Sequence, residues 1–198
     1  MIIKEEIMKQ LPEDPQIYLN AIKIDPSTIK AIMINEVVPA SPENDFYGSP
    51  DANYMETTIP LFQKAGIEVS TIEDILAHGI YLTNAIKTPK QETTIDNDSI
   101  ERSLPYLEQE LALFPNVQVI MLMGDVAKKC YNKITKKTTK KNVVPAISTY
   151  KLRNTELFYQ GIRIMPSYIM TGKNILIEKS KVQMAAEDLA TMFAIISE

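Results

Sequence analysis

Three short apolar runs in the sequence each end in residues whose side chains could do chemistry. Asn35 and Glu36 follow the first run, and Asn84 follows the second. Gly124 and Asp125 follow the third. A carboxylate can orient water or steady a positive charge, and an amide can both donate and accept hydrogen bonds. Ligands of open α/β sheets bind just outside the carboxyl ends of the strands, so these residues are candidates for one shared crevice.

The elements that position these residues can be predicted from the same runs. The stretch Ile29–Pro39 contains a continuous apolar segment, typical of a strand that is buried on both faces of a parallel sheet. The same pattern predicts strands over 79–83 and 117–123. A pair of strands is predicted over 149–152 and 158–165. Helical spacing or capping signals predict helices over 2–11, 17–24, 54–64, 70–77, 100–114, 126–134 and 174–196. Strands that alternate with helices predict a three-layer α/β/α sandwich with a mainly parallel central sheet, as a single domain over residues 1–198.

The composition excludes several classes of site. Cys130 is the only cysteine, which rules out a disulfide within the chain and a cysteine-ligated cluster or zinc site. His78 is the only histidine, so no His-rich metal site is expected, and we interpret His78 as structural. No apolar run is long enough to cross a membrane and the amino terminus does not resemble a signal peptide, so a cytoplasmic location is expected.

A lysine-rich stretch stands out against the formal net charge of −4. It contains seven lysines and no acid between its first and last members, which are Lys128, Lys129, Lys133, Lys136, Lys137, Lys140 and Lys141. A basic patch on an acidic body can bind phosphate. The alternative is a solvated, mobile loop, and the sequence does not decide between the two interpretations.

Four segments, taken in order, resemble the uracil-DNA glycosylase superfamily, most of all its thermostable bacterial and archaeal branch. The likeness extends from about residue 31 to residue 168 and is carried by the combination of Asn35–Pro39, Leu82–Lys87, Leu122–Ala127 and Met165–Tyr168. That branch has a Gly-Glu-Ala-Pro-Gly loop, strands that end in Thr-Asn-x-x-Lys and Leu-Gly-x-x-Ala, and a His-Pro-Ser-Tyr loop. The resemblance implies a uracil-DNA glycosylase-like fold and DNA as a partner. We expect a monomer.

The resemblance also implies roles for two of the polar residues. Excision of uracil requires the nucleotide to leave the base stack and enter a pocket, and positive charge then grows on the sugar. Glu36 is the candidate carboxylate that orients water and steadies this charge. Asn84 is the candidate amide that reads the edge of the base. The alternatives are a Glu that caps a nearby helix or forms a salt bridge with it, and an Asn that satisfies the backbone of its own turn.

Further residues are candidates for binding substrate or DNA. Phe46 or Tyr47 would stack on the base, unless these rings pack onto the core. Ser167 matches the serine of the family loop and is expected to touch substrate at a phosphate. Lys87 and Lys173 would neutralise neighbouring phosphates, although exposed lysines commonly have no specific role.

Two departures from the family pattern shape the functional hypotheses. The branch carries four cysteines that bind an iron–sulphur cluster, whereas this chain has one cysteine. No cluster is therefore expected here, and no other cofactor or metal is expected. The histidine of the His-Pro-Ser-Tyr loop is Met165, and a thioether cannot donate a hydrogen bond to a departing base. The leading hypothesis is a divergent DNA-base glycosylase. The alternatives are a non-catalytic nucleic-acid or nucleotide-binding protein and an enzyme that acts on a free nucleoside or another small molecule.

Overall fold

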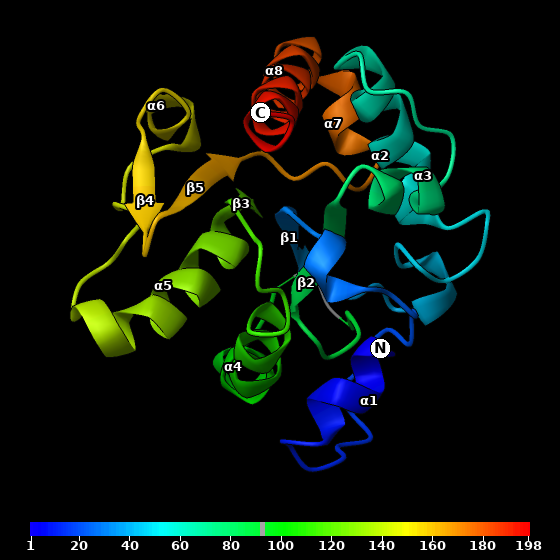
Figure 1. Ribbon diagram of the computed structural model, residues 1–198, viewed down its shortest axis with the longest axis vertical. Coiled ribbons are helices and arrows are strands. Elements are labelled where there is room, and N and C mark those ends of the chain that lie inside the picture. The colour runs from blue at the N-terminus through cyan, green and yellow to red at the C-terminus, as the bar shows by residue number, and fades with distance from the viewer. Residues whose placement is uncertain (92–93) are drawn as a thin grey trace.

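The structure is a computed structural model that describes residues 1–91 and 94–198, and a five-stranded sheet forms the centre of this part of the chain (Figure 1). The strands are β1 (Ala31–Val37), β2 (Ile80–Ile86), β3 (Val119–Met123), β4 (Leu157–Tyr159) and β5 (Ile162–Ser167). Their order across the sheet is β2-β1-β3-β5-β4. All neighbours are parallel except β4 and β5, which form an antiparallel hairpin at one edge. The predicted mainly parallel sheet is therefore confirmed.

Helices cover both faces of the sheet, as Figure 1 shows. One face packs against α1 (Ile3–Met8), α4 (Asn97–Leu111) and α5 (Asp125–Thr139). The other packs against α2 (Asn53–Lys64), α3 (Ile72–Ala77), α7 (Asn174–Ile177) and α8 (Lys179–Ile196). Ile32 and Ile34 belong to the first core, and Met33 between them belongs to the second. Because both faces are covered, β1 carries apolar residues at every position from Ala31 to Ile34, which explains its continuous apolar run.

The lysine-rich stretch is mostly helical and not a loop. Helix α5 continues to Thr139 and ends at Lys140, which adopts a left-handed conformation with φ 64°. Tyr131 and Thr135 keep one side of the helix buried along this length. The predicted end of this helix at residue 134 was wrong. Beyond that residue the helix has many lysines and few buried side chains, so the sequence shows little helical periodicity there.

Three other predicted elements differ from the structure. Residues 149–152 form a short helix, α6 (Thr149–Leu152), whose first turn is capped by the Ser148 side chain. The strand pair lies within residues 157–167, where Gln160 and Gly161 both have positive φ and close a tight hairpin. Residues 17–24 are extended and pair with the amino terminus through a bridge between Ile2 and Lys23. The closing helix is divided at Glu178 into α7 and α8.

Two short 3-10 helices complete the described structure, at Pro26–Thr28 and Pro42–Asn44. The second lies in the long loop that joins β1 to α2. The segments after β3 and β5 lie at the carboxyl ends of the parallel strands, where Asn35, Glu36 and Ser167 line one cleft.

Candidate functional site

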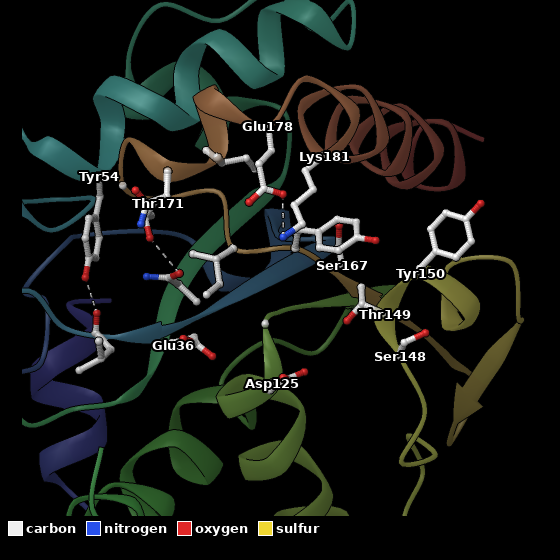
Figure 2. A pocket seen from close by; sticks show the side chains of 18 of the residues that line it. Glu36, Tyr54, Asp125, Ser148, Thr149, Tyr150, Ser167, Thr171, Glu178 and Lys181 are labelled. Atoms are coloured by element: carbon white, nitrogen blue, oxygen red, sulfur yellow. Dashed lines mark hydrogen bonds and ion pairs between the residues drawn. The ribbon is translucent and has the colours of Figure 1, made fainter. Parts of the chain in front are cut away.

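A cleft of about 800 Å³ opens at the carboxyl edge of β1, β3 and β5 (Figure 2). Its floor includes Asn35 from β1, Gly124 after β3, and Ser167 at the end of β5, and Glu36 from β1 lies beside this floor. Residues from α6, α7 and α8 form the remaining walls, and they include Ser148, Thr149, Tyr150, Asn174, Ile175, Glu178 and Lys181. The exits of β1, β3 and β5 therefore meet in one crevice, whereas Asn84 of β2, which was expected in the same crevice, does not line it.

Glu36 lies on one wall of this cleft at the start of α5. Its Oε2 atom accepts a hydrogen bond of 2.9 Å from the backbone N–H of Val126, in the first turn of the helix. Burial raises the pKa of the Glu36 carboxyl, and the Val126 N–H bond partly opposes that rise. Asp125 raises the pKa further, whereas Lys90 and Lys128 lower it. A half-buried carboxylate with a raised pKa is suited to accept a proton from water.

Gly124 allows Glu36 to take this position. Its φ is +95°, a backbone conformation that favours glycine. A Cβ atom at this residue would lie 2.7 Å from Cγ1 of Ile169 and 2.8 Å from Oε2 of Glu36. The turn from β3 into α5 therefore needs glycine both for its backbone and for the space that the carboxylate fills.

Replacing Gly124 by alanine is expected to lower the free energy of unfolding by about 2–4 kcal/mol, from backbone strain and the added clash. Gly66→Ala is the matched control, because Gly66 has φ +84° and nothing within 4 Å of an added Cβ. Urea unfolding of both variants separates the two effects, and Gly124→Ala should be the less stable. Equal losses would show that the space at Gly124 is not needed.

A chain of buried amides connects the cleft to the interior. Nδ2 of Asn84 donates to Oδ1 of Asp45 over 2.8 Å, and Nδ2 of Asn35 donates to Oδ1 of Asn84 over 2.9 Å. Oγ1 of Thr171 then donates to Oδ1 of Asn35 over 3.2 Å. Because an ionised Asp45 can only accept, it fixes the orientation of both amides. Asn35 and Thr171 line the cleft, whereas Asn84 is buried one step behind them.

Ser167 is held by a second buried network. Its Oγ donates to Oδ2 of Asp188 over 2.6 Å, and Nε of Arg153 donates to both oxygens of Asp188. Burial raises the pKa of Asp188, against the effects of Arg153 and Ser167. The only proton of the Ser167 hydroxyl is used by Asp188, so this oxygen faces a ligand as an acceptor. A ligand group that donates a hydrogen bond fits this position better than a phosphate, which can only accept.

Comparison with known proteins identifies the family of this chain. The family model of the uracil DNA glycosylase superfamily matches residues 43–188 of this chain. The chain belongs to the uracil-DNA glycosylase superfamily. A search of curated proteins found no match. Membership supports a glycosylase-like function in general, with DNA as the polymer on which the superfamily acts. The matched region contains Asn84, Gly124 and Ser167 but begins after Glu36, so the case for Glu36 rests on its position in the cleft.

Phe46 and Tyr47, which were expected to stack on a base, do not line the cleft. Phe46 is 1% exposed, packs at 5.3 Å from the ring of Tyr54, and borders a different cavity. The Tyr47 hydroxyl donates to the carbonyl of Leu82 and accepts from its N–H, which fastens the loop to β2. Tyr54 is the aromatic residue of α2 that reaches the cleft (Figure 2). The sequence did not reveal Tyr54 as a cleft residue, because its position depends on how α2 packs against the sheet.

Lys87 and Lys173 lie in contrasting environments. Lys87 is 3% exposed, and its Nζ lies 2.5 Å from Oε1 of Glu110 and 2.8 Å from Oγ1 of Thr83. An ammonium group buried in this way cannot reach a DNA phosphate in this conformation, so we do not retain that role for Lys87. Lys173 is exposed between Gly172 and Asn174, which both line the cleft, and its phosphate contact stays a prediction.

Met165 lies below the level of the cleft. It pairs with Met121 in β3, whereas Ser167 pairs with Met123 two residues closer to the strand exit. At about 3.3 Å per residue, the thioether is therefore about 7 Å deeper in the sheet than Ser167. It belongs to the apolar core that faces α2 and α8. Met165 is therefore not among the residues that line the cleft.

The remaining single residues belong to the scaffold. His78 ends α3, and its ring packs edge-on at 5.2 Å from the ring of Phe193, far from the strand exits in the fold. Cys130 is buried in α5, and burial raises the pKa of its thiol to about 12. Within residues 1–91 and 94–198, no group of three potential metal ligands occurs, and no helix has the length and apolarity needed to span a membrane.

Proposed function

We propose that this protein is a DNA-base glycosylase that excises uracil or another deaminated base by hydrolysis of the N-glycosidic bond. The observation that carries the proposal is the opposition of charges across the cleft. Glu36 lies on one wall, and Lys181 from α8 lies on the opposite wall above the Tyr168 ring (Figure 2). Bond cleavage builds positive charge on the sugar and negative charge on the base, and the two walls match those signs.

The reaction follows from this arrangement. A flipped nucleotide enters the cleft with its sugar beside Glu36 and its base toward Lys181. Water attacks C1′ of the sugar while the Glu36 carboxylate takes a proton from that water. The C1′–N bond breaks and its electron pair leaves with the base. The Lys181 ammonium steadies the anionic base, which is the role that the family loop assigns to histidine. Lys181 also pairs with Glu178 at 3.0 Å, which holds its side chain at the wall.

Recognition of the base is assigned to the oriented polar groups of the floor. The Ser167 oxygen accepts a hydrogen bond, as the bond to Asp188 requires. Asn35 presents an amide whose orientation is fixed from Asp45 through Asn84. An acceptor beside an amide suits the N–H and carbonyl edge of uracil. In this account, Asn84 contributes to recognition by orienting Asn35, and direct contact with a base would require the floor to rearrange.

The excision rate is expected to depend on pH through Glu36. General-base catalysis needs the ionised carboxylate, and burial raises its pKa above the ordinary value of 4.5. The rate should therefore fall with decreasing pH through a midpoint above 4.5. Because the protonated form is favoured in the folded state, this group stabilises the fold most at low pH, and that contribution is lost as the pH rises through the folded pKa. A pH–rate profile of kcat/KM checks this, and a flat profile from pH 4 to 8 would contradict it.

The proposal is tested with labelled oligonucleotides that carry one uracil, hypoxanthine or xanthine, in single- and double-stranded form. Alkali cuts the strand wherever a base has been released. Cleavage at one of these bases is expected for the wild type, and its loss in Glu36→Ala is expected. An intact strand for all three bases at high enzyme excess would overturn the enzymatic proposal.

A non-catalytic nucleic-acid-binding protein is the second candidate. The ion pair between Lys181 and Glu178 favours it, because a compensated ammonium stabilises an anionic base less than a free one. This candidate predicts binding of oligonucleotides that depends on the cleft, without release of a base. The same panel, followed by a binding assay, distinguishes the two.

A further inference from the structure

A second groove begins where the cleft ends and runs along α5. Its volume is about 610 Å³, and it shares Asp125 and Ser148 with the cleft. One wall is a face of α5 whose members recur at helical spacing, namely Lys128, Lys129, Asn132, Lys133 and Lys136. The other wall is the segment from Asn142 to Ser148. The groove is thus a continuation of the cleft and has a basic wall.

The opposite wall is held in place and is not a loose loop. Nδ2 of Asn132 donates to the carbonyl of Val144, and the N–H of Val144 donates to Oδ1 of Asn132, both over 2.9 Å. At the head of the groove, Nζ of Lys128 bonds to Oδ1 of Asp125 and to Oγ1 of Thr149. These contacts fix the segment 142–149 against α5, so the shape of the groove does not depend on a ligand.

The charge of the groove is only partly compensated. No acid occurs between residues 126 and 155. Lys133 pairs with Glu101 at 2.9 Å, and Lys137, on the next face, pairs with Glu108 at 2.7 Å. Lys129 and Lys136 take part in no salt bridge within the described part of the chain. Exposed pairs such as Lys133–Glu101 are weak and can exchange for another anion.

We propose that this groove, which we call the α5 groove, binds the sugar-phosphate backbone of the DNA strand that flanks the flipped nucleotide. The proposal rests on the proposed function for its ligand. Lys129 and Lys136 are seven residues apart, about 10 Å along a helix, which is about the rise of three nucleotides in a strand. Lys129, Lys133 and Lys136 contact three phosphates within this span, and continuity with the cleft gives the strand its path. The acidic remainder of the protein confines this contact to one side of the cleft.

The test compares two triple variants of the full chain. Lys129→Gln/Lys133→Gln/Lys136→Gln removes the charges of the α5 groove. Lys4→Gln/Lys23→Gln/Lys64→Gln removes three exposed lysines from other elements and is the matched control. Affinity for a single-stranded oligonucleotide without uracil is measured from 50 to 200 mM salt. Both variants should show the thermal unfolding of the wild type.

The groove variant is expected to lose about 0.7 from the slope of log affinity against log salt for each phosphate contact, about 2 in all. Over this fourfold change in salt, its affinity should therefore fall about 20-fold less than that of the wild type. The control variant should keep a slope close to that of the wild type. An unchanged slope in the groove variant, an equal change in both variants, or no binding by the wild type at 50 mM salt would each overturn the proposal.

Failure of this proposal can be separated from failure of the proposed function. Glu36→Gln is expected to lose base excision and keep the salt dependence of the wild type. If no base is released by the wild type but the groove variant has the lower slope, the α5 groove stands and the glycosylase proposal falls. If bases are released and the groove variant has the slope of the wild type, the glycosylase proposal stands and the α5 groove proposal falls.

Discussion

Replacement of Glu36 by glutamine is expected to lower the rate of base excision by about 10²–10⁴-fold, the usual contribution of general-base catalysis. Glutamine keeps an oxygen that can accept the bond from the Val126 N–H, so the start of α5 should stay intact. What it removes is the ability to take a proton from water and to offset positive charge on the sugar. Single-turnover excision at enzyme excess measures this loss directly.

Asp125→Asn is the control for this experiment. Asp125 also lines the cleft, only one residue from Val126, but its side chain is 91% exposed and pairs with Lys128. An exposed carboxylate in water is expected to contribute little to catalysis, so the rate should change less than about tenfold. Comparable losses in both variants would show that the cleft needs negative charge in general and not Glu36 as a base.

Replacement of Lys87 by methionine is expected to lower the free energy of unfolding by about 3–5 kcal/mol. Lys87 and Glu110 are 3% and 1% exposed, and their charges face each other across 2.5 Å. Oε2 of Glu110 also accepts from the hydroxyls of Tyr81 and Thr83. Without the ammonium, a buried carboxylate remains with no opposite charge. Urea unfolding followed by circular dichroism gives the change in free energy.

Two further variants show whether this loss comes from the buried charge. Lys87→Met/Glu110→Gln removes both charges and keeps an oxygen acceptor for the hydroxyls, so it should be more stable than Lys87→Met alone by at least about 1 kcal/mol. Lys64→Met on the exposed surface of α2 should change stability by less than about 0.5 kcal/mol. A loss below about 1 kcal/mol for Lys87→Met would contradict the structural role.

Lys87 also shows where reasoning from sequence fails. It follows the exit of β2 in a polar context, and the pattern there predicted an exposed cation near DNA. The strand in fact continues to Ile86, and the partner that buries Lys87 is Glu110, on a helix 23 residues later. Local periodicity carries no information on such a pair. The same limit hid Asp188, which orients Ser167 from α8.

The features that depend on local physics were predictable. The apolar run of β1 requires burial on both faces, and the structure has helices on both. The helix predicted over 70–77 is α3, and its start is a capping box in which both reciprocal hydrogen bonds between Thr71 and Asp74 are present. The start of α4 was predicted less well, because the helix was expected from residue 100 but is capped by Asp96 and begins at Asn97. Caps are a matter of one or two residues, and several acids or hydroxyls compete for the position.

The candidate site was predicted in outline and not in detail. The position of Glu36 after a buried strand pointed to the cleft, and the structure has its carboxylate there. Asn35 was visible as the first polar residue of the same exit, but only the register of β1 with β2 shows that it stands in front of Asn84. The register of β5 with β3 also explains why Met165 lies in the core. It is two residues before Ser167, which lines the cleft at the end of the strand.

The most direct test of the account is the identity of both products from one uracil-containing oligonucleotide. The wild type is incubated in excess over the strand, and mass spectrometry measures the free base and the remaining polymer. Free uracil and an unbroken abasic strand are expected in equal amounts, and Glu36→Gln should form both at least about 100-fold more slowly. An intact uracil-containing strand would contradict the excision of uracil by this cleft, and a strand cut without release of uracil would contradict glycosidic hydrolysis.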